Sequence, residues 1–213
     1  MNTQEKVANA LLDISAVGFA LDKPLTFKSG IISPVYVDNR KLPFHVDAWK
    51  IVIEGLQDLI AQKQVIIDVL AGIETAGIPH SSVVGYEMRI PSVIIRKAAK
   101  DHGTKKKIEG GSVKGLHAAV LEDHITTAGS SLHGVHELKE AGAIVDTCLA
   151  ITSYGWKEAE DAFATEGVRL LTLTTFPIIL EQALKRSLVT KDEVAKIKEW
   201  LEDPHGWAAK HGF

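Results

Sequence analysis

Apolar and polar positions alternate along the chain in blocks whose period changes, which predicts strands and helices in regular succession. Near-continuous apolar runs are typical of strands buried on both faces, and they cover 65–73, 92–96, 117–123, 144–152 and 168–174. Apolar residues at helical spacing predict helices between these runs, at about 75–88, 131–142 and 156–167. Strands that alternate with helices indicate an α/β fold with a central, mostly parallel sheet flanked by helices.

The two ends of the chain carry elements outside this alternation. Apolar spacing predicts a first helix that Gly18 can end, and a second helix over about 45–62. Between them, residues 19–42 are rich in β-formers and are broken by proline and glycine, which predicts short strands and a turn. Two further helices are expected near 177–187 and 190–202.

Length and composition fit one domain. The 213 residues suit a single domain over 1–213, in which about 1–42 form an N-terminal cap and about 43–213 form the core and the C-terminal helices. Hydrophobic residues make up 46% and charged residues 24%, which excludes the disordered classes. The net charge of −3 argues against a general nucleic-acid surface. The single Cys148 excludes a disulfide framework and a Cys-based zinc site, and it is expected to be a buried thiol.

Several targeting and catalytic motifs are absent from the sequence. The first residues do not resemble a signal peptide, and no run of about 18 apolar residues occurs, so we expect a cytoplasmic protein without a membrane or nucleic-acid partner. The chain has no Walker A loop, no Gly-x-Gly-x-x-Gly fingerprint, no Gly-x-Ser-x-Gly elbow and no His-Glu-x-x-His motif. Their absence disfavours P-loop NTPases, Rossmann dehydrogenases, serine hydrolases and zincins.

The segment VLEDHITTAGSS (120–131) carries the strongest chemical signal. Ligands of parallel sheets bind at the carboxyl ends of the strands, and here a strand runs into Glu122 and Asp123, then into small and hydroxylated residues before a helix. Backbone N–H groups at a helix start favour phosphate, and the two acids suit hydroxyl groups or a bound Mg²⁺. A sugar phosphate satisfies both, whereas the alternative is a plain turn with a Ser/Thr helix cap. We interpret His124, in place of an expected apolar residue, as structural.

Two further loops point to an anionic ligand. The glycines of AGIETAGIP (71–79) allow a sharp turn that forms a second anion pocket, although a purely structural turn fits equally well. The stretch IRKAAKDHGTKKKIEGG (95–111) holds six basic residues, His102 and three glycines, which predicts a mobile basic lid over an anionic substrate. The alternative for this stretch is a solvated basic loop.

A fourth segment, PLTFKSGIISPVYVDNR (24–40), precedes the regular alternation. Its Lys28 lies in a Lys-Ser-Gly turn that can reach a carboxylate or phosphate, and its Tyr36 can stack on a planar ring. A β-hairpin with exposed polar residues is the alternative.

Together these four segments resemble the type I phosphoribosyltransferases, and most closely the orotate phosphoribosyltransferase family. They occur in the family's order and cover roughly 24–131. The resemblance implies the type I phosphoribosyltransferase-like fold and transfer of the 5-phosphoribosyl group from 5-phosphoribosyl 1-pyrophosphate (PRPP) to orotate. The products are orotidine 5′-monophosphate and pyrophosphate, in pyrimidine (UMP) biosynthesis. It also implies Mg²⁺ carried mainly by PRPP, and a homodimer in which each lid serves the neighbouring site.

The resemblance also implies a role for each matching residue. Catalytic roles fall to Lys28, Lys100 and His102. Glu122 and Asp123 would hold the ribose hydroxyls, and Tyr36 would lie along the base. The remaining substrate-binding residues are Arg96 and Lys97 at the pyrophosphate, and Thr126, Thr127, Ala128, Gly129 and Ser130 at the 5′-phosphate. No residue of the chain is expected to act as a dedicated metal ligand.

Two departures from the family pattern leave alternatives open. Ala128 stands where many members have Gly, which is a mild change if its φ is negative. After the strand ending near 152, many members have an Asp-Arg pair whose Arg binds the orotate carboxylate, whereas this chain has Thr152, Ser153 and Tyr154. Either another cation substitutes, with Lys28 favoured over Lys157, or the base is not orotate. The alternatives are a phosphoribosyltransferase for another nucleobase, a non-catalytic PRPP-sensing regulator, and a sugar-phosphate enzyme of another α/β family.

Overall fold

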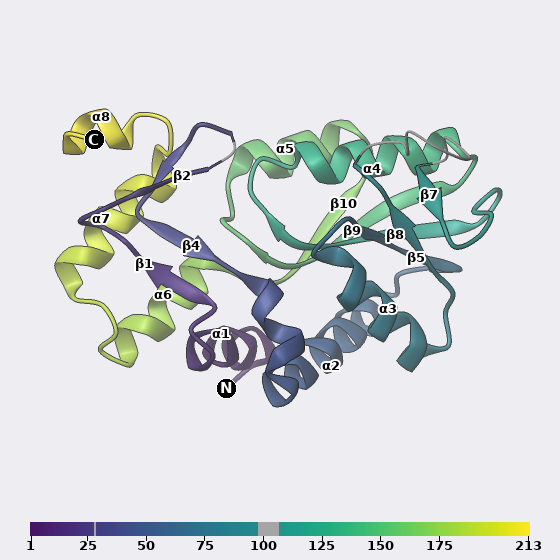
Figure 1. Cartoon of the computed structure of the whole chain (residues 1–213), viewed down its shortest axis with the longest axis horizontal. Coiled ribbons are helices and arrows are strands. Elements are labelled where there is room, and N and C mark those ends of the chain that lie inside the picture. Colours follow the sequence, from purple (N-terminus) through teal and green to yellow (C-terminus); the bar gives the residue numbers. More distant parts are fainter. Residues whose placement is uncertain (28, 98–106) are drawn as a thin grey trace.

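The computed structural model describes residues 1–27, 29–97 and 107–213, and a six-stranded sheet lies at its centre (Figure 1). The strand order is β10-β9-β8-β5-β6-β7. Five strands pair in parallel: β5 (Val69–Ile73), β6 (Ser92–Ile95), β8 (His117–Ile125), β9 (Ile144–Ser153) and β10 (Arg169–Thr175). The short β7 (Ile108–Glu109), which the sequence pattern did not predict, pairs antiparallel at one edge. The predicted α/β fold is therefore confirmed.

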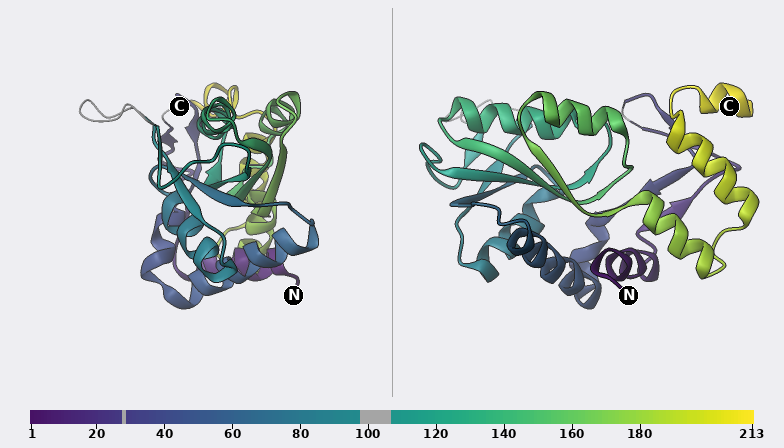
Figure 2. Two further views of the ribbon diagram at one scale, coloured as in Figure 1. Left: turned by 90° about the vertical axis from the view of Figure 1, so that its right-hand side faces the viewer. Right: turned by 180° about the vertical axis from the view of Figure 1, so that it is seen from behind.

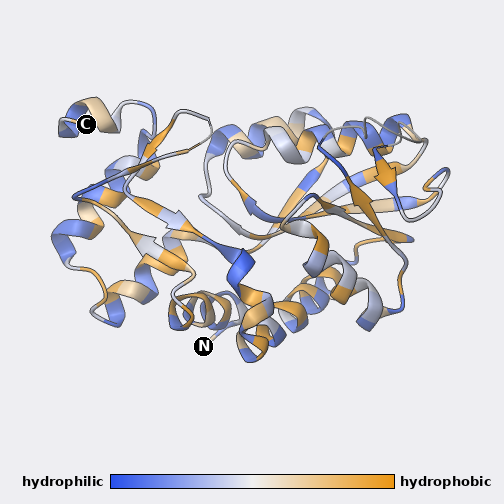
Figure 3. Ribbon diagram, in the orientation of Figure 1, coloured by the Kyte–Doolittle hydropathy of each residue, from blue (hydrophilic) through white to orange (hydrophobic). Residues whose placement is uncertain are grey.

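Helices cover both faces of this sheet (Figures 1 and 2). The helices α4 (Gly129–Glu140) and α5 (Lys157–Thr165) lie on one face, and α1 (Thr3–Asp13), α2 (Val46–Gln62) and α3 (Gly77–Met88) lie on the other. Successive strand residues point to opposite faces, so Leu121 packs in the cluster with α1 and α2, while Val120 packs in the cluster with α4 and α5. Both faces need apolar side chains, which explains the continuous runs and the hydrophobic colouring of the central strands in Figure 3.

The N-terminal strands form a separate layer beside the C-terminal helices. Strand β1 (Val17–Phe19) pairs with β4 (Val35–Val37), and β2 (Leu25–Thr26) pairs with β3 (Ile32–Ser33); a 3-10 helix, η1 (Asn39–Phe44), follows. These strands lie next to α6 (Phe176–Lys185), α7 (Lys191–Glu202) and α8 (Trp207–His211), the last of which was not predicted (Figure 1). The Trp200 indole donates a 3.0 Å hydrogen bond to the Ile32 carbonyl, which ties the two ends of the chain together.

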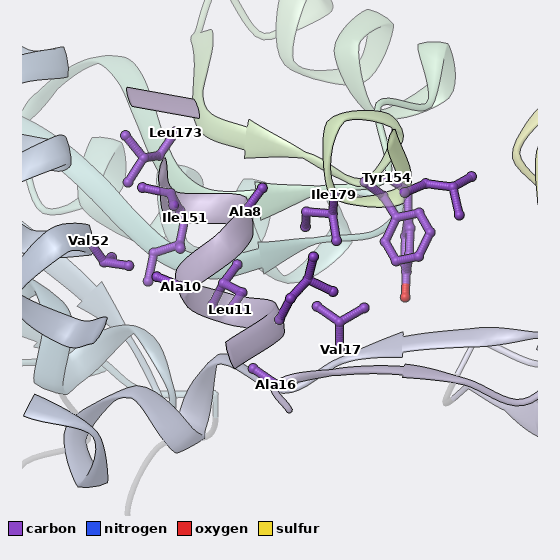
Figure 4. Packing of buried hydrophobic residues seen from close by; sticks show 14 of the residues in the cluster. Ala8, Ala10, Leu11, Ala16, Val17, Val52, Ile151, Tyr154, Leu173 and Ile179 are labelled. Carbon is purple, nitrogen blue, oxygen red and sulfur yellow. The ribbon is translucent and has the colours of Figure 1, made fainter. Parts of the chain in front are cut away.

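One large apolar cluster joins this layer to the sheet. Figure 4 shows Leu11 of α1, Val17 of β1, Ile151 of β9 and Ile179 of α6 packed together. The N-terminal residues thus share a core with the sheet and with the last helices. That residues 1–213 form one domain stays a prediction, in keeping with this shared cluster.

The expectation that Gly18 ends the first helix is wrong. Helix α1 ends at Asp13, and Ser15 takes a left-handed conformation with φ of 52°. Gly18 lies inside β1, directly opposite Tyr36 of β4. A Cβ atom at Gly18 would lie 1.9 Å from a ring carbon of Tyr36, so glycine is required there by the ring above it. No helix within the described residues is long and apolar enough to cross a membrane.

Candidate active site

A cavity of about 520 Å³ opens at the carboxyl ends of β5, β6, β8 and β9, where the sequence places the chemical signals. Its wall brings together segments that lie far apart in the chain. The lining residues are Phe27, Tyr36, Val37, Asp38, Arg40, Glu74, Thr75, Ala76, Lys97, Glu122, Asp123, His124, Thr126 and Tyr154. Five predicted site residues are among them: Tyr36, Lys97, Glu122, Asp123 and Thr126. The predicted catalytic residues Lys28, Lys100 and His102 lie outside the described residues.

The two adjacent acids at the end of β8 interact closely. Glu122 is buried and its Oε1 accepts the Asp123 backbone N–H at 3.2 Å, while the Ser130 hydroxyl lies 3.5 Å from Glu122 Oε2. Burial, and then the charge of Asp123, raises the pKa of Glu122 well above its usual range. Burial also raises the pKa of Asp123. The two acids therefore resist carrying two negative charges together, and a ligand that offers hydroxyl hydrogens or a cation stabilises their ionised forms.

The turn after β8 leaves the start of α4 open. Ala128 precedes the helix, and no side chain of the described residues caps its first turn. The alternative of a Ser/Thr helix cap is therefore not observed, and the N–H groups of Gly129 and Ser130 have no helical acceptor. Ala128 has φ of +67° and ψ of −9°. Alanine in place of glycine was expected to be a mild change only at negative φ, so here the change is not mild. The loop keeps the left-handed shape that glycine adopts without strain.

Close approach explains the glycines of the 71–79 segment. A Cβ on Gly72 would lie 2.1 Å from Ser81 Oγ, and a Cβ on Gly77 would lie 2.4 Å from the Leu121 carbonyl oxygen. Neither glycine has positive φ, so neither is needed for a left-handed turn. Their lack of a side chain instead allows α3 to pack closely against β5 and β8. The segment contributes Glu74 to the cavity wall, a residue that sequence reasoning did not select.

The predicted pyrophosphate residues take different positions. Lys97 lines the cavity, and its backbone N–H donates to Glu74 Oε2 at 3.1 Å. Arg96 is not part of the lining; its guanidinium forms ion pairs with Glu74 (3.5 Å) and Glu109 (3.6 Å). Glu74 thus orients both residues at the end of β6.

An aromatic wall closes the cavity beside the ends of β8 and β9. The buried Tyr154 ring stacks on the Phe27 ring, with 5.8 Å between the ring centroids. It also contacts the His124 ring edge-to-face, with 4.5 Å between the centroids. Sequence reasoning placed neither Tyr154 nor His124 in a ligand site, although a histidine at an apolar strand position was a usable signal. Lys157, offered as a substitute for the missing arginine, is not among the lining residues and pairs with Asp161 on its own helix.

A parallel sheet with an acid pair at one strand end, an open helix start after it, and a cap of N-terminal strands defines the type I phosphoribosyltransferase class. Known structures agree on the fold. The chain matches Leishmania donovani UMP synthase with a TM-score of 0.82 at 23% identity, covering 94% of this chain and 42% of that one. It matches orotate phosphoribosyltransferase from Aeropyrum pernix with a TM-score of 0.75 at 27% identity, covering 86% of this chain and 99% of that one.

Sequence similarity narrows the class to one family. The chain is 39% identical over 207 residues to orotate phosphoribosyltransferase from Listeria monocytogenes serotype 4b (strain F2365), covering 97% of this chain and 99% of the relative. No protein-family model matches the chain. The chain belongs to the orotate phosphoribosyltransferase family.

Proposed function

We propose that this protein transfers the 5-phosphoribosyl group from PRPP to orotate, forming orotidine 5′-monophosphate and pyrophosphate in pyrimidine biosynthesis. The observation that carries the proposal is one cavity whose wall contains the acid pair, Lys97 at the end of β6 and the aromatic wall around Tyr154. PRPP, a ribose that carries a phosphate at one end and a pyrophosphate at the other, and a planar acceptor base together match these three surfaces. The family membership supports the same reaction.

The ribose and its 5′-phosphate bind at the end of β8. Glu122 and Asp123 accept hydrogen bonds from the ribose hydroxyls, which favours their ionised forms. The 5′-phosphate binds the turn formed by Thr126, Thr127, Ala128, Gly129 and Ser130, where backbone N–H groups and the helix dipole stabilise the anion.

The pyrophosphate binds at the opposite side of the acid pair. Lys97 faces it from the cavity wall, and Arg96 reaches it by exchanging an ion pair with Glu74. We extend the resemblance to Lys28, Lys100 and His102, which add positive charge around the reacting centre. As pyrophosphate leaves, positive charge develops near C1′ of the ribose and negative charge grows on the leaving group. Cations that bind the leaving group more tightly in the transition state lower the barrier.

Mg²⁺ would enter this site with PRPP and would be held mainly by PRPP oxygens. Carboxylate oxygens of Glu122 and Asp123 line the same cavity and are ligands that Mg²⁺ accepts. The ion would neutralise charge on the pyrophosphate.

A homodimer in the cytoplasm completes the proposal. Large apolar side chains are exposed on one surface near the start of α2: Phe44 is 87% exposed and Val46 is 69% exposed. Exposed apolar groups that lie together are typical of a surface that a partner covers. A second copy of the chain is the partner that the family resemblance implies.

A base panel tests the proposed function. The protein is incubated with PRPP, Mg²⁺ and each of orotate, uracil, hypoxanthine and adenine, and pyrophosphate release is followed. We expect release with orotate, and a loss of at least about 100-fold in the Asp123→Asn variant, as when one preorganised electrostatic partner is removed. Release with a purine and not with orotate would overturn the substrate. PRPP binding without release for any base would favour the sensing regulator.

A further inference from the structure

Two cationic side chains of the described residues line the cavity, and they reach it from different elements. Lys97 follows β6, whereas Arg40 belongs to η1, which comes directly after the cap strand that carries Tyr36. The other charged residue that the described part of the cap contributes to the wall is Asp38. Without Arg40, this part of the cap would therefore present only negative charge to a bound ligand.

The Arg40 guanidinium is held in place and is still open to a ligand. Its Nε donates a 2.5 Å hydrogen bond to Asp38 Oδ1, and its two terminal nitrogens contact no acceptor among the residues that the structure describes. The side chain is 72% exposed, so a ligand can approach these nitrogens from the cavity. Asp38 thus orients a fork of two N–H donors, an arrangement that a carboxylate accepts with both of its oxygens.

Arg40 also lies within electrostatic reach of the acid pair. The hydrogen bond and the charge of Asp38 raise the pKa of Arg40, and the charge of Asp123 adds a smaller contribution in the same direction. In the proposed function the acids bind the ribose hydroxyls, and the acceptor base is joined to C1′, next to the carbon that carries the 2′-hydroxyl. The base therefore lies in the part of the cavity that Asp123 and Arg40 both border.

Orotate differs from uracil only by a carboxylate on the ring, so an enzyme that selects orotate needs a positive group or N–H donors near that carboxylate. We propose that Arg40 is a specificity-determining residue whose free terminal nitrogens bind the carboxylate of orotate. The guanidinium that this chain lacks after β9 is then supplied by the cap. The inference rests on the proposed function, because it assumes a ribose on the acid pair and a pyrimidine beside it.

A pair of nucleotides isolates this contact. Orotidine 5′-monophosphate and uridine 5′-monophosphate share the ribose, the 5′-phosphate and the ring, and they differ only in the carboxylate. Isothermal titration calorimetry measures both dissociation constants. We expect the wild type to bind orotidine 5′-monophosphate about tenfold more tightly, as for one charge-assisted contact at a partly exposed site. In Arg40→Ala this preference should disappear, while the constant for uridine 5′-monophosphate stays unchanged. Arg40→Lys keeps the charge without the fork and should retain only a small part of the preference.

The neighbouring Lys41 provides the matched control. Its Nζ donates to the Ser15 carbonyl oxygen at 2.8 Å, and the residue is not part of the cavity lining. Lys41→Ala removes the same charge from the same short helix, so its preference between the nucleotides should equal that of the wild type. The dissociation constant of PRPP should change less than about twofold in all variants. Thermal unfolding reports whether each fold is retained, and Arg40→Lys decides the outcome if Arg40→Ala does not fold.

Three results would overturn the role of Arg40. The first is a wild type that binds both nucleotides equally, and the second is a folded Arg40→Ala variant that keeps the wild-type preference. The third is an equal loss of affinity for both nucleotides, or a matching loss for PRPP, which would place Arg40 at the ribose or at a phosphate. None of these results bears on the proposed function, because pyrophosphate release by the wild-type protein in the base panel decides that first.

Discussion

At the scale of single residues, the most consequential detail is the backbone conformation of the turn before α4, where we propose that the 5′-phosphate binds. Ala128 adopts a left-handed conformation immediately before α4, where its Cβ crowds the backbone. The cost of that conformation is about 1–2 kcal/mol for a residue with a side chain. The position of the turn was evident in the sequence, whereas the sign of φ was not, because φ depends on how β8 is joined to α4.

Replacing Ala128 by glycine is expected to stabilise the protein. Glycine removes the left-handed strain, but its greater entropy in the unfolded chain costs about 0.5–1 kcal/mol of stability. We therefore expect the free energy of unfolding to rise by about 0.5–1 kcal/mol. Urea unfolding of the Ala128→Gly variant measures it. Ala141, at the other end of α4, has φ of −76°, so Ala141→Gly relieves no strain and should destabilise the protein. Equal losses in the two variants would contradict the interpretation of Ala128.

At the scale of secondary-structure elements, one buried histidine connects two helices. His80 of α3 is fully buried, and its Nδ1 accepts the Trp49 indole N–H of α2 at 2.9 Å. The ring is therefore neutral with its hydrogen on Nε2, and burial lowers its pKa to about 4. Protonation of Nδ1 would break the contact between α2 and α3.

This contact predicts a loss of stability in mild acid. The unfolded chain binds a proton on His80 below about pH 6.5, whereas the folded protein does so only near pH 4. The stabilisation is complete above pH 6.5 and declines as the pH falls, by about 2 kcal/mol at pH 5. Urea unfolding at pH 7.5 and pH 5 should show a smaller acid loss in His80→Leu than in the wild type. An identical loss in both proteins would exclude this role of His80.

At the scale of the whole molecule, the two ends of the chain pack together beside the sheet, and an apolar surface lies near the start of α2 (Figure 1). The N-terminal strands pack beside α6 and α7, so the cavity receives Phe27 and Tyr36 from the cap while the sheet supplies the acids. On the outside, Phe44 and Val46 border a surface hollow of about 660 Å³ between α1 and α2. We attribute this surface to the proposed homodimer.

Introducing a charge on this surface should weaken the dimer. The Phe44→Glu variant places a carboxylate where the second copy would bury a ring, so we expect the dissociation constant of the dimer to rise at least about 100-fold, as for a central interface residue. Sedimentation velocity over a range of concentrations measures it. Leu188 is exposed in the turn after α6, and Leu188→Glu is the matched control. A monomeric wild type, or dimers of equal strength in both variants, would contradict the assignment.

Periodicity predicted most of the architecture because each element is amphipathic or apolar along its own length. The buried strands and their helices were evident for this reason, and Cys148 is buried as expected. The predicted end of the first helix was wrong, because Gly18 lies in a strand and leaves room for the Tyr36 ring of the neighbouring strand. The two-residue strand β7 and the five-residue helix α8 were missed, because such short segments show no period.

The sequence by itself determined the sheet, its layers of helices and the acid pair followed by a turn of small residues, since these follow from local spacing and from the chemistry of adjacent residues. Only the tertiary structure decided that Glu74, His124 and Tyr154 border the same cavity as Glu122, and that Lys157 does not. It also decided that Asn39, Thr152 and the Asp123 carbonyl form one hydrogen-bonded group, because they come together from three separate segments. Such contacts depend on long-range neighbours, and no local pattern in the chain encodes them.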